Sequence, residues 1–321
     1  MSADVVRPAG TEESGLAAVA RSDRPRATRS GRSAGWSRST AAYALLAPGL
    51  SLLAVFTLAP IGFGLWLSFT DWDGVGTAQW VGLHNYAAIA HDPEFRTAML
   101  NTIVFAIGAI VGKNVVGLAL ALLVNQKVRG QRLFRTVLFF PVTMSVIVIG
   151  AFWSFFLNGQ DGLLNRALRG IGADWLARDW LTDPSVALYA VIAVEIWRYA
   201  GLHMLILHAG LQEVPEELHE AAKIDGAGAW RRFLVVTLPA IRPVLFVSVL
   251  LSLMGAFVRS FDLIWVLTRG SADTQVAVTE IYNEAFQFQK FGSSAAMGYV
   301  LFVVVAVIAT IYIRQARGGR E

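Results

Sequence analysis

Six long apolar runs dominate the pattern of hydrophobic and polar positions along the chain. Each is roughly 20 residues long, which is enough for a helix to cross a hydrocarbon core of ~30 Å. The runs do not show the alternation of the strands in a membrane β-barrel. The pattern therefore predicts an all-α membrane protein with about six transmembrane helices, the first kinked or broken at Pro48 and Pro60. The runs cover Tyr43–Phe69, Thr102–Val124, Phe134–Leu157, Val186–Leu207, Val244–Leu267 and Ala295–Ile313.

Composition agrees with a membrane protein and divides the chain. Only 16% of its 321 residues are charged and 55% are hydrophobic, whereas a soluble domain has about 25% charged residues. Residues 1–40 are rich in Arg and Ser and poor in large apolar side chains, so we expect a disordered tail. Residues 41–315 form the predicted transmembrane domain, and residues 316–321 form a second short tail. Cysteine is absent, which excludes disulfides and thiolate metal sites.

The positions of the basic residues predict the orientation of the chain. Most of the 27 Lys and Arg residues lie in the N-terminal tail, in the 126–135 and 209–243 loops, and after residue 313. Loops rich in Lys and Arg stay in the cytoplasm. We therefore expect both termini and the 209–243 loop to be cytoplasmic.

The loop at residues 211–239 carries a pattern for two short helices. Pro215 suits the first turn of a helix, where its missing N–H is not needed, and the two glutamates that follow favour a helix N-terminus. This helix should run to about Ile224. Gly226 permits a left-handed turn, and Asp225 is expected to cap the next helix.

The second of these helices has one apolar stripe. Trp230, Phe233 and Leu234 are spaced to share a helix face, and Pro239 marks the return to the membrane. The loop is therefore expected to form an L-shaped pair of short helices on which a partner docks.

This loop resembles the EAA loop of permeases in binding-protein-dependent ABC importers. The residues that carry the resemblance are Glu220, Ala221, Ala222, Asp225, Gly226, Ala227, Phe233, Leu238 and Pro239. Over about residues 42–315, the chain looks like the first of two permease subunits in sugar importers of the maltose and glycerol-phosphate type. Further stretches that match are Ser68-Phe-Thr-Asp-Trp72, Val81-Gly-Leu-His-Asn-Tyr86, Asp92-Pro-Glu-Phe95, Asn101-Thr-Ile-Val-Phe105 and Gly210-Leu-Gln212.

One outer loop departs from the pattern of that family. Relatives usually read Leu-Thr-x-Gly-Gly-Pro after the fifth span, whereas this chain reads Leu267-Thr-Arg-Gly-Ser-Ala272. The conformation of this loop is therefore not implied by the resemblance.

The resemblance implies the fold, the partners and the role of the loop. The fold is the transmembrane domain of a type I (MetI-like) ABC importer in the plasma (inner) membrane of a prokaryote. The implied partners are a second, homologous permease, two ATP-binding subunits, an extracytoplasmic solute-binding protein, a sugar or oligosaccharide, and membrane lipid, without nucleic acid. ATP hydrolysis belongs to the separate subunits, so the chain is not an enzyme and has no cofactor. The EAA residues named above, except Leu238, would couple it to the ATPase.

Charged residues inside the apolar runs form a second candidate site. A charge at membrane depth costs at least ~2.5–3.5 kcal/mol, so such residues face a partner or a wet cavity. Glu195 and Arg198 are three apart and can pair on one helix face, and Arg259 and Asp262 repeat this arrangement. They line a polar solute path or form structural ion pairs, and the sequence leaves both readings open.

Neighbouring residues refine this prediction. In the path reading, Trp197 or Tyr199 stacks on the solute. Lys113 and Asn114, in the second run, are expected at a subunit interface or a water pocket, with solute binding as the alternative.

Other classes of function fit less well. A secondary transporter commonly has more spans and internal repeats, and it has no ATPase for an EAA loop to engage. An intramembrane enzyme needs paired catalytic groups such as H-E-x-x-H, which the sequence lacks. Gly112-Lys113 has no P-loop pattern around it, and the five His residues have no metal-like spacing.

Overall fold

The structure, a computed structural model, describes residues 34–126 and 130–318. The chain divides into two units at Leu58. In the first unit, α1 (Ala34–Leu53) contains Pro48 and continues into the π-helix η1 (Ala54–Leu58). Helix α1 therefore begins before the boundary expected at residue 41. The prediction of a disordered tail otherwise falls on residues 1–33, which lie outside the described residues.

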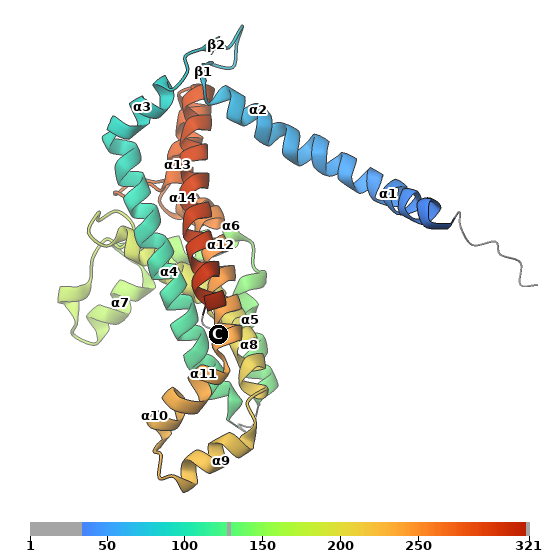
Figure 1. The fold of residues 1–321 in the computed structure, drawn as a ribbon. Coiled ribbons are helices and arrows are strands. Elements are labelled where there is room, and N and C mark those ends of the chain that lie inside the picture. The colour runs from blue at the N-terminus through green and yellow to red at the C-terminus, as the bar shows by residue number, and fades with distance from the viewer. Residues whose placement is uncertain (1–33, 127–129, 319–321) are drawn as a thin grey trace, which may run out of the picture. The chain divides into compact units, whose positions relative to one another are not determined.

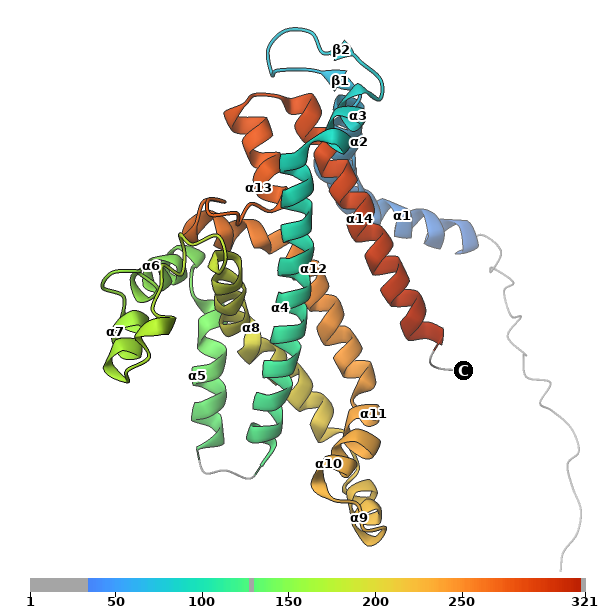
Figure 2. The same ribbon diagram turned by 90° about the vertical axis from the view of Figure 1, so that its left-hand side faces the viewer.

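The second unit is a helical bundle with one short hairpin. Strands β1 (Thr70–Asp71) and β2 (Gln79–Trp80) pair antiparallel, with Thr70 opposite Trp80. Figures 1 and 2 show this hairpin at one end of the bundle and α9 and α10 at the other. The α-helices are α2 (Ala59–Leu67), α3 (His84–His91), α4 (Pro93–Asn125), α5 (Gln131–Thr143), α6 (Val146–Phe156), α7 (Leu163–Gly170), α8 (Ala187–Gln212), α9 (Glu216–Ile224), α10 (Ala229–Arg232), α11 (Leu238–Ala240), α12 (Arg242–Leu267), α13 (Ala277–Tyr282) and α14 (Phe291–Gly318). Short 3-10 and π turns are η2 (Asp174–Leu176), η3 (Phe233–Thr237) and η4 (Asn283–Gln287).

The prediction of about six spans is confirmed within the described residues. Four helices are long and apolar enough to cross a membrane, and the number rises to six if each of two bent pairs is one span. In the first span, the α-helical pattern is interrupted at η1, which contains Phe56, the residue to whose carbonyl Pro60 cannot donate because it has no N–H.

The third predicted run is not one straight helix. Helices α5 and α6 meet at an angle of 100°. Met144 and Ser145 between them have extended backbones, with ψ of 145° and 140°, which interrupts the helical hydrogen bonds.

Close packing of α4 on α8 organises the core. A Cβ added at Gly117 would lie 2.8 Å from the His203 Cβ, and one at Gly108 would lie 3.1 Å from the Ile192 side chain. Glycine at these positions lets the two backbones approach closely, as small residues do between membrane helices. This approach sets Lys113 of α4 against α8.

Candidate functional site

The first half of the 211–239 loop folds as the sequence predicts. Helix α9 ends at Ile224, and Gly226 has a φ of 76°. The Gly226 N–H donates to the Lys223 carbonyl at 3.0 Å, and the Ala227 N–H donates to the Ala222 carbonyl at 2.9 Å. These two bonds form a Schellman motif, which a residue in the left-handed conformation completes. The predicted left-handed turn is confirmed.

The second half of this loop differs from the prediction at its start. Gly228 is the N-cap of α10, and no side chain caps that helix. The expected capping role of Asp225 is therefore wrong, because Asp225 ends α9 instead. Trp230 and Phe233 stack with ring centroids 5.5 Å apart. Pro239 lies in α11, which leads into α12.

The loop leaves apolar side chains uncovered at the end of the bundle. Ile224 is 86% exposed, Trp230 71% and Leu218 49%. Glu220, Ala221 and Asp225 are also exposed, whereas Ala222, Ala227 and Phe233 are half-buried. These exposed apolar side chains are available for contact with another molecule.

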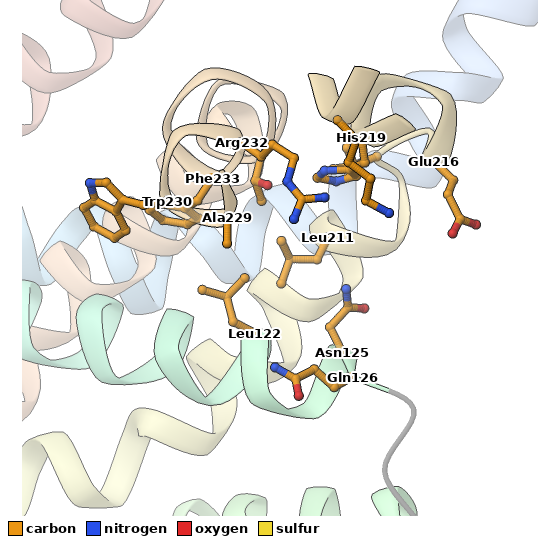
Figure 3. A pocket seen from close by; sticks show the side chains of 13 residues that line it. Leu122, Asn125, Gln126, Leu211, Glu216, His219, Ala229, Trp230, Arg232 and Phe233 are labelled. Atoms are coloured by element: carbon orange, nitrogen blue, oxygen red, sulfur yellow. The ribbon is translucent and has the colours of Figure 1, made fainter. Parts of the chain in front are cut away.

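A cavity of about 1000 Å³ lies between this loop and the ends of α4 and α8 (Figure 3). The Arg232 Nε is buried there without a hydrogen-bond partner in the described chain. The labelled lining residues are Leu122, Asn125, Gln126, Leu211, Glu216, His219, Ala229, Trp230, Arg232 and Phe233.

The intramembrane charges pair differently from the prediction. Lys113 Nζ of α4 lies 3.1 Å from Glu195 Oε1 of α8, and both side chains are 1% exposed. Arg198 is not the partner of Glu195, because its Nε and Nη1 are buried without a hydrogen-bond partner in the residues that the structure describes. Because Lys113 is buried within the single chain, its expected location at a subunit interface is wrong, whereas its location at a water pocket stays a prediction.

Three cationic side chains lie close to the ring of Tyr199. The ring centroid is 5.3 Å from Lys113 Nζ, 5.1 Å from Arg198 Cζ and 4.9 Å from Arg259 Cζ. Arg259 and Asp262 are exposed. They do not form the predicted ion pair, since the ion pairs of residues 34–126 and 130–318 join other side chains.

Trp197 lies away from this cluster. Residues two apart on a helix face nearly opposite directions, and Trp197 packs on α6, with its ring centroid 5.3 Å from that of Trp153. The structure therefore brings Glu195, Arg198, Tyr199 and Arg259 together and separates Trp197 from them.

A second buried polar network was not predicted from the sequence. The Asn114 amide donates to Ser252 Oγ at 3.1 Å and accepts from Ser248 Oγ at 2.7 Å. His203 Nδ1 lies 2.8 Å from Ser248 Oγ. The available signal was the spacing of Ser248 and Ser252, four apart on one helix face. Asn114 is also buried inside the chain, so its expected location at a subunit interface is wrong.

The loop after α12, whose sequence differs from the family pattern, contains strained backbone. Arg269, Ala272 and Asp273 have φ values of 54°, 54° and 55°. The left-handed region is costly for residues with a Cβ. The hydroxyls of Thr268 and Thr274 share a hydrogen bond of 2.6 Å that closes the loop.

Among the residues that the structure describes, no group of three His, Cys, Asp or Glu could hold a metal. The described residues form a helical bundle with four to six candidate membrane spans, which is the organisation of a multi-pass membrane protein. Residues 113–317 match the family described as binding-protein-dependent transport system inner membrane component, and the chain belongs to that family.

Similar proteins agree with this assignment. The chain is 34% identical over 279 residues to the sn-glycerol-3-phosphate transport system permease protein UgpA of Escherichia coli O6:K15:H31, covering 86% of this chain and 94% of UgpA. It is 34% identical over 276 residues to the probable starch degradation products transport system permease protein AmyD of Thermoanaerobacterium thermosulfurigenes, covering 85% and 93%. A bacterial ABC transporter involved in alginate import shares the fold, with a TM-score of 0.77, 24% identity and coverage of 88% and 96%. The predicted type I importer fold is confirmed.

Proposed function

We propose that this chain carries a sugar or oligosaccharide through the inner membrane, as one of two permeases that work with two ATP-binding subunits and an extracytoplasmic solute-binding protein. Family membership supports the importer assignment. The relatives named for starch degradation products and glycerol phosphate support a carbohydrate or polyol solute.

The EAA loop is the proposed coupling element, and its uncovered apolar surface carries this proposal. Ala221 and Ala222 are small enough for α9 to enter a cleft of the ATPase, where Glu220 can meet a basic side chain. The turn at Gly226 holds α9 and α10 at a fixed angle. Helix α10 then passes the displacement through α11 into α12.

Two glycines in this turn allow a matched test. Gly226 and Gly228 both have open space around an added Cβ, but only Gly226 has a positive φ. We expect Gly226→Val to leave the chain inserted but to abolish uptake and substrate-stimulated ATP hydrolysis, whereas Gly228→Val keeps both. Glu220→Lys should act like Gly226→Val. Normal uptake and normal ATPase association in Gly226→Val and Glu220→Lys would contradict the coupling role.

The proposed solute path runs along the face of α8 and α12 that carries Tyr199, Arg259 and Asp262. Arg259 and Asp262 are exposed in the single chain, so they are available to a solute or to the second permease. Glu195 and Arg198 support this face from inside the bundle.

The proposed orientation has the EAA loop and both termini in the cytoplasm, from the positive-inside distribution of Lys and Arg. The Cys-free sequence permits a test with an impermeant thiol reagent in intact cells. Val75, which is 79% exposed between β1 and β2, and Gly228, where nothing lies within 4 Å of an added Cβ, suit single Cys substitutions. We expect labelling at 75 and not at 228, and the reverse result overturns the orientation.

A further inference from the structure

The segment between α6 and α8 is an ordered element before the N-terminus of α8, and the EAA loop follows the C-terminus of the same helix. Asn165 of α7 is fully buried. Its amide donates to the carbonyls of Gly159 at 2.7 Å and Arg178 at 2.9 Å, and it accepts from the Trp180 indole at 2.8 Å. These bonds hold α7 and the chain after it in one arrangement.

The inner side of this segment is attached to the ends of the spans. Leu164, Trp180 and Leu181 pack against the hydrophobic cluster that contains Leu157 and Leu188. Helix α8 has 26 residues, which at ~1.5 Å per residue gives about 39 Å. Because the hydrocarbon core is ~30 Å thick, the N-terminal end of α8 reaches the interface, and α7 is held at that level.

The outer side of the segment is apolar along one edge and basic along the other. Ile171 is 79% exposed, Trp175 78% and Leu163 44%. Arg166 and Arg169 are also exposed and lie on the other edge of α7. Figure 2 shows α7 projecting from the side of the bundle.

We propose that residues 163–175 form an interfacial anchor that inserts Leu163, Ile171 and Trp175 into the lipid bilayer. Helices with an apolar edge and a basic edge lie in the membrane interface, and Trp concentrates there. Arg166 and Arg169 then lie among the headgroups. Asp161 pairs with Arg166 at 3.4 Å, which partly offsets one of the two positive charges on this edge. The anchor holds the outer end of α8 at a fixed depth while its other end carries the EAA loop.

Site-directed spin labelling tests this anchor in the assembled transporter reconstituted in phosphatidylcholine vesicles. Single Cys residues replace Ile171, Trp175 and, as the control on the other edge of α7, Arg169. Collision with oxygen, which concentrates in the bilayer, is compared with collision with a water-soluble nickel chelate. We expect the oxygen-to-nickel ratio to be several-fold higher at 171 and 175 than at 169. Adding phosphatidylglycerol should not change this order.

Two other results would overturn the anchor. High nickel accessibility at 171 and 175 means that the edge faces water. Low accessibility to both reagents means that protein, such as a second permease, covers it. If the Cys variants do not assemble, the unlabelled transporter is compared with Trp175→Phe in lipids with brominated acyl chains. The difference in fluorescence between these two proteins is the contribution of Trp175. If Trp175 is inserted, brominated lipid lowers this difference, and an unchanged difference contradicts insertion.

Discussion

Lys113 Nζ and Glu195 Oε1 lie 3.1 Å apart between α4 and α8, with both side chains almost completely buried. The second carboxylate oxygen of Glu195 has no hydrogen-bond partner in the described residues. Removing one member of a buried ion pair leaves the other charge uncompensated, which costs about 3–5 kcal/mol. This pair therefore fixes how α4 and α8 pack.

A double-mutant cycle tests the structural role of this pair. Lys113→Met and Glu195→Leu should each lower the melting temperature of the purified protein strongly, because each leaves a buried charge. The double variant should recover most of the loss, since neither charge remains. Additive losses in the double variant would show that the two side chains do not interact.

Measurements of solute uptake should distinguish the role of the exposed charged residues from that of the buried ones. Arg259→Gln and Asp262→Asn should lower uptake roughly ten- to hundredfold at unchanged yield of the complex, because a hydrogen bond to a charged group contributes about 1.5–3 kcal/mol. Glu195→Gln should instead lose uptake in proportion to lost complex. Trp197→Phe is the control, as Trp197 lies on another side of α8, and it should keep uptake. If the uptake of Arg259→Gln and Asp262→Asn falls only with complex yield, both residues are structural.

Ala272→Gly should stabilise the protein. Ala272 has a φ of 54°, and the left-handed conformation costs a residue with a Cβ roughly 1–2 kcal/mol. Glycine removes this strain but loses more backbone entropy on folding, so the expected gain is at most about 1 kcal/mol. Thermal unfolding measures it. Ala167→Gly, at an exposed position in α7, should have the opposite sign, and a loss of stability in both variants would contradict the strain.

Glu280, outside the candidate spans, should make stability depend on pH. Burial first, and then the nearby Glu94, Asp92 and Glu284 carboxylates, raise the pKa of the Glu280 carboxyl above its ordinary value of 4.5. Because the pKa of Glu280 is raised in the folded state, the stabilising contribution of the Glu280 carboxyl is complete below pH 4.5. This contribution is lost as the pH rises through the pKa of the folded state.

Glu280→Gln should therefore raise the melting temperature at pH 8 and change it little near pH 4. Glu217→Gln, at an exposed position in α9, is the control and should have little effect at either pH. A Glu280→Gln effect that does not vary with pH would contradict the shifted pKa.

The sequence alone determined the features that depend on local chemistry. Apolar length predicts the spans, because a helix must satisfy its own backbone hydrogen bonds in lipid. The turn at Gly226 follows from one residue without a Cβ and the helix that ends before it. The EAA residues were recognisable for the same reason, since they lie within one short stretch of the chain.

Only the tertiary structure decided the partners of the intramembrane charges. Arg198 is three residues from Glu195, but Lys113 is 82 residues away, and only the close packing of α4 on α8 makes it the nearer cation. The bend between α5 and α6 was similarly hidden in a continuous apolar run. A charge in a low-dielectric interior pairs with whichever opposite charge the packed helices bring to it, and sequence spacing along one helix does not contain that information.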